Sequence, residues 1–251
     1  MKKSNVSFIL VEPREGGNIG AAARAIKNMG FTRLELVAPC DFTTLEATSF
    51  AHGAQDVLDS AKVYGSLDEA VSGKALVVGI SRRAGKTRGV IPNLSEAVIK
   101  IARYAEENET AIVFGREDKG LYNVEVLRCG FLASIPTSEA HPSLNLAQAV
   151  LLAAYELSRH GGHVATTKIP PLVTQAELES LYERADKLLK TLGYGPRGTQ
   201  DLPGGIMRNM RHFVGRAGLT RWEFSMLHGI CTSIEKKVRL PRDVTETDTS
   251  D

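Results

Sequence analysis

Cysteine is scarce in this sequence and gives no sign of a cross-linked or metal-bound fold. Only Cys40, Cys129 and Cys231 occur among the 251 residues, an odd number at wide spacing. Such a set supplies neither a disulfide framework nor the paired ligands of a zinc site. We therefore expect a reduced protein that holds no metal.

Long hydrophobic runs are also missing. The longest, within residues 146–157, is interrupted by Gln148, Tyr155 and Glu156 and is too short to cross a bilayer. The beginning, MKKSNVSFILVEP, has only four apolar residues in a row before Glu12, fewer than a secretory signal needs. With 43% apolar and 24% charged residues, the chain has globular composition, and we expect a cytoplasmic location.

Acidic residues are nearly absent from one late segment. Residues 1–167 contain 18 basic and 18 acidic side chains, whereas residues 204–242 contain eight basic and two acidic ones. The last nine residues, 243–251, carry four acids and have the composition of a disordered tail. The basic segment suits a polyanion, but charge alone fits an ordinary solvated helix face equally well.

The first 160 residues alternate strand-like and helix-like segments. Runs such as ALVVGI and AIVF are apolar without alternation, which is typical of strands buried on both faces of a sheet. The alternation predicts an α/β fold, a parallel sheet with helices on both faces. The expected strands are 6–11, 33–38, 74–80, 110–115 and 131–136, and the expected helices are 18–29, 67–73, 94–107, 121–129 and 145–159.

The remaining residues have the pattern of a small all-α domain. Two glycines and two prolines in GGHVATTKIPPLVT indicate a linker, and the segments after it have apolar residues at helical spacing. The last two helices are expected to divide near Ala217–Thr220. We therefore divide the chain into an α/β domain (1–160), a linker (161–175), a helical extension (176–242) and an acidic tail (243–251).

A glycine cluster follows the first strand, in EPREGGNIGAAARAIKNMG. Glycines between a strand and a helix suggest a dinucleotide-binding turn, but Gly16, Gly17 and Gly20 give GGxxG instead of GxGxxG. The second strand ends in APCDF, with its acid placed beyond a proline, which disfavours a nicotinamide or flavin enzyme. Arg24, inside the alanine-rich helix, is either an ordinary surface residue or is held for an anion.

The stretch PSLNLAQAV, residues 142–150, begins a helix that is apolar on most faces, so we expect that helix to be largely buried. Asn145 and Gln148 have the spacing of a capping box, which explains Asn145. Ser143 has no such explanation. It follows Pro142 at the positive end of the helix, a place that suits a ligand as well as a cap.

Three segments together resemble a known family. NIGAAARAIKNMGF, IVFGREDKGL and IPTSEAHPSLNLAQAV are similar, in order and spacing, to the three motifs of the SpoU/TrmH family of SPOUT-class RNA 2′-O-methyltransferases. The C-terminal segment NMRHFVGRAGLTRWEFSMLHGICTSIEKKV further resembles the TrmJ-like branch, which methylates the ribose at nucleotide 32 of the tRNA anticodon loop. The sequence leaves open cytidine, uridine or both, a ribosomal RNA substrate, and an RNA-binding protein that has lost catalysis.

The resemblance implies a sheet whose C-terminal part forms a trefoil knot, an exception to the unknotted rule. It also implies S-adenosylmethionine as methyl donor, and tRNA and a second copy of the chain as partners, with no DNA and no membrane. Each copy would lend its first motif to the other's site. By position, the expected cofactor contacts are Ile80, Ser81, Arg82, Gly115, Ile135, Pro142, Ser143, Leu144 and Asn145. Any side chain at Gly115 is expected to occupy the space of the adenosyl group; the alternative is that Gly115 is a simple turn residue.

The same resemblance assigns catalytic roles. Arg24 matches the family arginine proposed to activate the ribose hydroxyl. An arginine stays protonated, so we expect it to bind a phosphate and stabilise alkoxide charge rather than act as a base. Asn18 is expected to orient Arg24 or the substrate. Glu117 is expected to pair with an arginine across the site, or to be a helix-start carboxylate. The Ser143 hydroxyl is expected to bind the target ribose or phosphate.

RNA contacts are expected at two places. Arg83, Lys86 and Arg88 lie on a glycine-containing loop beside the proposed cofactor site, and the helical extension supplies further arginines. Trp222 and Phe224 offer rings for base stacking, although their helical spacing favours the core of the extension. The expected contacts in the extension are Arg208, Arg211 and Arg216.

Overall fold

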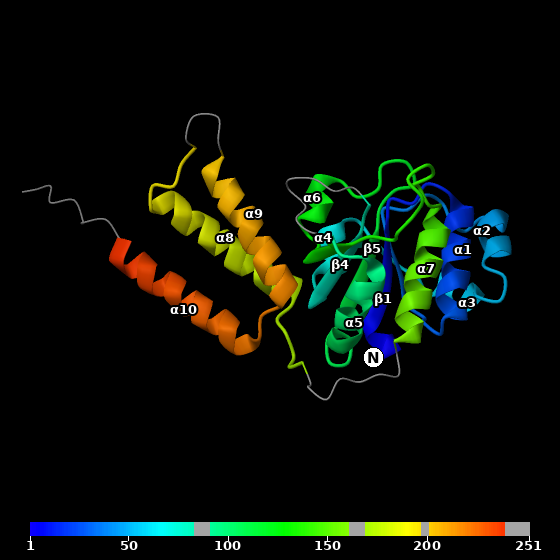
Figure 1. Cartoon of the computed structure of the whole chain (residues 1–251), viewed down its shortest axis with the longest axis horizontal. Helices are drawn as coiled ribbons and strands as arrows, with labels where there is room; N and C mark the ends of the chain where they lie inside the picture. The colour runs from blue at the N-terminus through cyan, green and yellow to red at the C-terminus, as the bar shows by residue number, and fades with distance from the viewer. Residues whose placement is uncertain (83–90, 161–168, 197–200, 239–251) are drawn as a thin grey trace, which may run out of the picture.

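We describe residues 1–82, 91–160, 169–196 and 201–238 of a computed structural model of the chain (Figure 1). The predicted RNA contacts Arg83, Lys86 and Arg88, most of the predicted linker and the predicted acidic tail lie outside these residues. None of the helices described is both long and apolar enough to span a bilayer.

A six-stranded sheet forms the centre of the first domain. Its strands pair in the order β3-β2-β1-β5-β4-β6, and every pairing is parallel. All residues of β1, β2 and β5 are buried, as their unbroken apolar runs require. The strands are β1 (Val6–Val11), β2 (Leu34–Val37), β3 (Lys62–Tyr64), β4 (Leu76–Ile80), β5 (Thr110–Phe114) and β6 (Phe131–Ala133).

Helices cover both faces of this sheet, as predicted. One apolar cluster joins the sheet to α1 (Gly16–Asn28), α2 (Leu45–Phe50), α3 (Gln55–Asp59), α5 (Leu94–Tyr104) and α7 (Leu146–Arg159). A second cluster, on the other face, joins it to α4 (Leu67–Val71) and α6 (Asn123–Val126). Figure 1 shows α7 beside α1, with α2 and α3 at the outer end of the same face.

The five predicted strands and five predicted helices of this domain are confirmed, with ends shifted by a few residues. Four short elements escaped prediction, namely α2, α3, β3 and a 3-10 helix at Lys3–Asn5. Strand β3 has only three residues at the edge of the sheet, with Lys62 and Val63 exposed, so it carries no apolar run. Helix α7 is less buried than expected, because Leu151, Leu152 and Tyr155 are exposed on its outer face.

Three helices form the extension, α8 (Gln175–Thr191), α9 (Leu202–Ala217) and α10 (Arg221–Val238). Thr174 caps α8 in a capping box with Glu177, and Gly218, with a φ of 73°, ends α9 at the predicted division. Helix α8 packs against both α9 and α10. Their apolar side chains form a separate core, which explains why the extension has the pattern of an independent helical domain.

The extension is fixed to the first domain rather than tethered at a distance. The backbones of Gly130, before β6, and Gly215, in α9, approach so closely that a Cβ on Gly215 would lie 2.3 Å from the Gly130 carbonyl oxygen. The Tyr104 hydroxyl donates to the Ala217 carbonyl at 2.6 Å, and the Lys100 amine donates to the Arg216 carbonyl. These bonds satisfy carbonyl groups at the C-terminal end of α9.

The carboxylate of Glu179 and the side-chain amide of Asn108 each make hydrogen bonds that strengthen this docking. Glu179 of α8 accepts from Arg128 of the first domain at 3.2 Å and from Arg211 of α9. Asn108 accepts from the Leu172 backbone N–H at 2.7 Å and donates to the Pro170 carbonyl, so the end of the predicted linker lies against the first domain. These bonds hold α8 and the segment before it against the first domain.

Replacing Gly215 by alanine is expected to weaken this docking, because the new methyl group would overlap the Gly130 backbone. The expected loss in unfolding free energy is about 1–3 kcal/mol. Gly205→Ala in the same helix is the control. No atom lies within 4 Å of its added Cβ, so it is expected to gain up to about 1 kcal/mol. Urea unfolding followed by far-UV circular dichroism measures both; equal stability would contradict the close contact.

Candidate active site

A pocket opens at the carboxyl ends of β4, β5 and β6, where an open parallel sheet presents its ligands. Eight of the nine residues predicted to bind the cofactor line it, Asn145 being the exception. The full lining is Ile80, Ser81, Arg82, Phe114, Gly115, Arg116, Glu117, Asp118, Lys119, Gly120, Leu121, Ile135, Thr137, Pro142, Ser143, Leu144, Leu146 and Ala149. Segments far apart in the sequence therefore meet around one space, as predicted.

Of the two predictions for Gly115, the structure supports the turn residue. Directly after it the chain makes a tight turn, in which the Gly120 N–H donates to the Arg116 carbonyl at 2.8 Å. A Cβ on Gly115 would lie 2.1 Å from the Gly120 carbonyl carbon and 2.2 Å from the Leu121 nitrogen. The turn itself excludes a side chain here, so the requirement exists before any adenosyl group binds.

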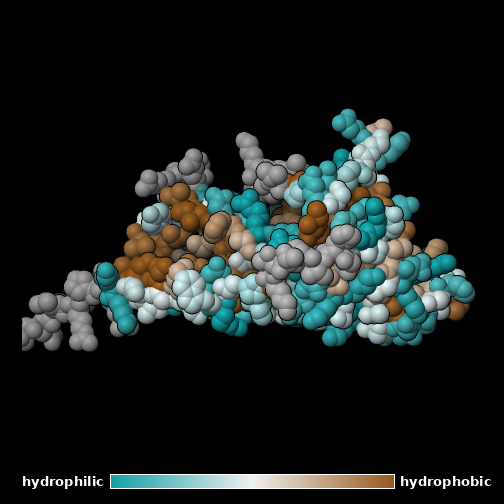
Figure 2. Space-filling model, turned by 60° about the horizontal axis from the view of Figure 1, so that its bottom comes forward, coloured by the Kyte–Doolittle hydropathy of each residue, from teal (hydrophilic) through white to brown (hydrophobic). Residues whose placement is uncertain are grey.

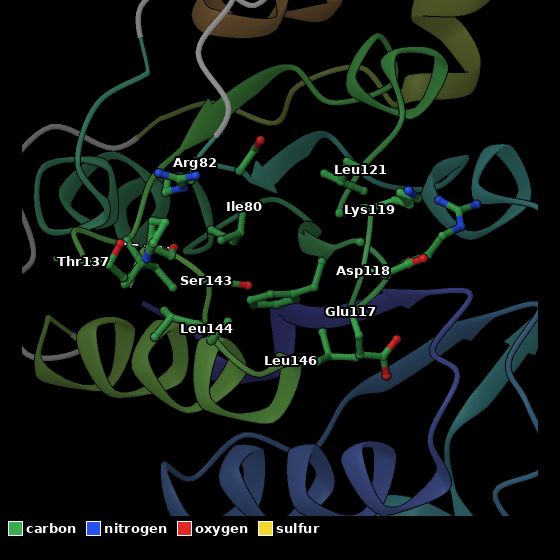
Figure 3. Close-up of a pocket in the computed structure, with 18 residues that line it drawn as sticks. Ile80, Arg82, Glu117, Asp118, Lys119, Leu121, Thr137, Ser143, Leu144 and Leu146 are labelled. Carbon is green, nitrogen blue, oxygen red and sulfur yellow. Dashed lines mark hydrogen bonds between the residues drawn. The ribbon is translucent and has the colours of Figure 1, made fainter. Parts of the chain in front are cut away.

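In PSLNLAQAV, Asn145 caps the helix as predicted and Ser143 does not. Asn145 accepts hydrogen bonds from the Ala147 and Gln148 backbone N–H groups, and the Gln148 side chain accepts from the Asn145 backbone, so the capping box is confirmed. Ser143 takes no part in the cap. It is exposed on the loop before α7 and projects into the pocket between Ile80 and Leu144 (Figure 3).

Asn18 connects the three predicted motifs. Its side chain, with 8% of the residue exposed, donates to Glu117 Oε1 and to Glu15 Oε2, each at 3.0 Å. Its Oδ1 accepts from the Asn145 side chain at 2.8 Å. Both ends of the amide are thus engaged, and the start of α1, the turn after β5 and the start of α7 share one hydrogen-bond network.

Glu117 has partners other than those predicted. Within the described part of the chain it accepts from the Asn18 amide and from the Arg14 backbone N–H, at 3.2 and 3.3 Å to its two oxygens. The Arg14 guanidinium binds Asp118 instead, at 2.8 Å. Glu117 also lies in the turn after β5 rather than at the start of a helix, so that alternative is wrong, whereas its pairing with an arginine across the site stays a prediction.

Arg24 is exposed on α1 between the buried Ala23 and Ala25. It does not line the pocket of its own chain, and no described residue forms an ion pair with it. A guanidinium in this state is available to an outside anion. The pocket and the predicted catalytic arginine are therefore separate within one copy of the chain.

Sequence reasoning missed Arg116, the arginine of FGRE. It is 4% exposed, binds Glu12 and Glu125 and stacks on the Tyr122 ring with its guanidinium carbon 4.0 Å from the ring centroid. Its hydrogen bonds to Glu12 and Glu125 raise the pKa of Arg116. The hydrogen bond between Arg116 and Glu12 also holds the pKa of Glu12 below its usual value. Glu125 in turn accepts from the Tyr122 N–H at 2.7 Å. Arg116 thus joins β1, the pocket turn and α6.

One expectation for the extension needs correction, and one residue proves to be paired within the chain. The Arg211 guanidinium is bound by Glu179 and stacks on the Tyr182 ring, so it holds α8 and α9 together, and its contact with RNA stays a prediction. Trp222 is 71% exposed, so the expected place in the helical core is wrong for it, whereas Phe224 does pack against that core. Within the described residues, no group of His, Cys, Asp and Glu has the arrangement of a metal site.

Removing the Arg116 charge is expected to cost about 3 kcal/mol or more of unfolding free energy, because Arg116→Met leaves the buried Glu125 carboxylate unpaired. Arg14→Met provides a matched control in a neighbouring loop. Its ion pair with Asp118 is 55% and 41% exposed, so the expected loss is below about 1 kcal/mol. Urea unfolding at neutral pH compares them; similar losses would show that burial does not govern the Arg116 network.

Comparison with known proteins agrees with this geometry. Residues 5–155 match the SpoU rRNA Methylase family. The chain is 36% identical over 245 residues to the tRNA (cytidine/uridine-2′-O-)-methyltransferase TrmJ of Yersinia pestis (strain Pestoides F), covering 95% of this chain and 94% of that protein. It is 36% identical over 247 residues to the tRNA (cytidine/uridine/adenosine-2′-O-)-methyltransferase TrmJ of Pseudomonas aeruginosa (strain UCBPP-PA14), covering 93% and 95%.

A solved structure extends the agreement to the fold. The crystal structure of TrmJ from Z. mobilis ZM4 superposes with a TM-score of 0.74 at 32% identity, covering 91% of this chain and 98% of that one. The matched region of the family includes all six strands, the pocket and α1 with Arg24. The chain belongs to the SpoU methylase family, whose fold carries the predicted trefoil knot.

Proposed function

We propose that the protein transfers a methyl group from S-adenosylmethionine to a ribose 2′-hydroxyl of tRNA, at nucleotide 32 of the anticodon loop and on cytidine, uridine or both. The observation that carries this proposal is a pocket lined by the second and third motifs, to which the hydrogen bonds of Asn18 tie the first motif. The relatives named above are tRNA 2′-O-methyltransferases, which adds independent support.

A tRNA substrate is favoured over ribosomal RNA by where the similarity extends. The family match ends at residue 155, before the helical extension begins. The similarity to the tRNA enzymes covers 95% of the chain and so includes most of α8, α9 and α10. An extension shared with tRNA enzymes supports the same class of substrate.

The pocket lining fits S-adenosylmethionine by its chemistry. Ile80, Ile135 and Leu144 give apolar walls for a purine ring, and the turn at Gly115 presents backbone groups. Arg82 and Lys119 in the lining have the charge to bind the carboxylate of S-adenosylmethionine. Asp118 and Glu117 have the charge to bind its ammonium or sulfonium group. When bound, S-adenosylmethionine supplies an activated methyl group.

The chain's own residues then have to align and activate a hydroxyl. Ser143 is placed to bind the ribose or its phosphate inside the pocket, and alignment provides much of the acceleration in such a displacement. Arg24 binds the neighbouring phosphate and stabilises the charge that develops on the 2′-oxygen. The proton leaves through that phosphate or through water, because an arginine does not accept it. Asn18 and Glu117 hold the loops on which these groups depend.

We further propose a homodimer in which Arg24 serves the pocket of the other subunit. Arg24 is exposed and absent from its own pocket. Helix α7, which packs beside α1, exposes Leu151, Leu152 and Tyr155 on its outer face. These apolar side chains support an interface with a second subunit. Such an interface would bury them and would position Arg24 toward the partner's pocket.

Phosphate contacts complete the proposal. Arg83, Lys86 and Arg88 remain predicted contacts beside the pocket, and Arg208 and Arg216 remain predicted contacts on α9. Neither Arg208 nor Arg216 forms an ion pair with a described residue. Such contacts are expected to weaken with added salt because RNA binding releases counterions.

Wild-type protein is expected to methylate bulk tRNA, giving 2′-O-methylated nucleosides at nucleotide 32, measured with radiolabelled S-adenosylmethionine and nucleoside analysis. Arg24→Lys is expected to lower the rate by about 100-fold, because lysine lacks the planar fork. Lys27→Met, one turn further along α1, is the control and is expected to keep full activity. A wild-type protein that binds tRNA without methylating it would indicate a non-catalytic relative.

A heterodimer separates catalysis across the interface from catalysis within one chain. Arg24→Ala and Ser143→Ala subunits, each expected to be inactive alone, are co-expressed with different affinity tags and purified together. If Arg24 acts on the partner's pocket, each heterodimer has one intact site and about half of the wild-type activity. Absence of recovery in a confirmed heterodimer would contradict the shared site.

A further inference from the structure

The outer face of α10 carries an unusual set of side chains for a surface. Trp222 is 71% exposed, Met226 44% and Ile230 49%, and their spacing of four residues places them along one side of the helix. Figure 2 shows hydrophobic colour gathered over the C-terminal helices, while most of the first domain is hydrophilic on the same view. We call Trp222, Met226 and Ile230 the aromatic face, after its exposed indole ring.

The charge carried by α9 and α10 is predominantly positive. Between Leu202 and Val238 the only acidic residues are Glu223, which accepts from Thr220, and Glu235, which binds Arg184. No described residue forms an ion pair with four basic side chains of α9 and α10. These are Arg208, Arg216, Lys236 and Lys237.

One basic side chain lies in register with the aromatic face. Lys237 follows Ile230 by seven residues, two helical turns along the same side of α10. Arg216 is likewise exposed, on α9. An exposed ring together with nearby cations is the composition of a surface that binds unpaired nucleotides.

We propose that the aromatic face binds unpaired bases of the RNA substrate, with Trp222 as the principal stacking ring. The inference rests on the proposed function and deepens it, since it assigns a base-binding role to a surface distant from the methyl-transfer pocket. Stacking accepts any base, because every base has a π-face. The flanking cations bind the phosphates of the same strand.

Charge decides between RNA and a second copy of the chain as the occupant. Two copies that met through this face would bring together the four basic side chains of α9 and α10 that have no ion-pair partner among the described residues, with Glu223 and Glu235 the only acids of those helices. Like charges at an interface disfavour association. An RNA strand presents the opposite charge together with apolar rings.

The chain contains a single tryptophan, so its fluorescence reports on this face alone. Titration of the full-length protein with tRNA is expected to quench Trp222 emission and to protect it from acrylamide. S-adenosylmethionine alone is expected to leave the emission unchanged. Unchanged emission at saturating tRNA would overturn the proposal. So would protection by anionic vesicles without tRNA, or by raising the protein concentration, which would assign the face to a membrane or to a second copy.

Substitutions test the same contact by affinity. Trp222→Ala is expected to weaken tRNA binding about tenfold in a filter assay, equivalent to about 1.4 kcal/mol, while leaving S-adenosylmethionine binding unchanged. Trp222→Tyr is expected to retain most of the affinity, because it keeps a ring. Ile99→Ala on α5, where the residue is 58% exposed, is the control for loss of an exposed apolar side chain and is expected to bind normally. Equal tRNA affinity of Trp222→Ala and wild type would overturn the proposal.

Wild-type methylation, measured in parallel, keeps the two proposals apart. Methylation of tRNA without protection of Trp222 would refute the base-binding face and leave the enzyme assignment standing. Protection of Trp222 by tRNA without methylation would refute the enzyme assignment and support the face.

Discussion

The hydrogen bonds of the Asn18 amide hold the site together. One buried side chain accepts from Asn145 and donates to Glu117, and so fixes the starts of α7 and α1 against the turn after β5. An amide has one accepting and one donating end, and both are engaged, so its orientation is determined. Burial strengthens such bonds and makes an unpaired group costly. The pocket wall and the helix that carries Arg24 therefore keep a fixed relation.

Two further constraints shape the pocket from outside the predicted set. The turn between Arg116 and Gly120 leaves no room for a side chain at Gly115, and the buried Arg116 guanidinium connects that turn to Glu12 and Glu125. A buried charge is tolerated only when it is paired, and here the pairing joins three segments of chain. The FGRE motif thus contains a structural arginine beside a glutamate that faces the site.

The side chains that fix the fold are different from the side chains that are available to an outside partner. Buried or paired groups such as Arg116, Arg211 and Glu179 fix loops and helices to one another. Arg24 and Trp222 are instead exposed, and the surrounding helices hold them in place without covering them. Groups meant for an outside partner are useful only if the protein's own folding does not consume them. The proposed subunit contact and the proposed base contact both use such groups.

The sequence by itself determined the strand–helix alternation, the capping box at Asn145 and the pocket residues, because apolar runs, caps and family motifs are local patterns. It did not reveal β3, whose three edge residues lack an apolar run, or the partners of Glu117, which lie about a hundred positions away. Only the tertiary structure decided which arginine is buried, which is paired and which is free. It also placed Trp222 outside the core, because helical spacing identifies the side of a helix but not what covers it.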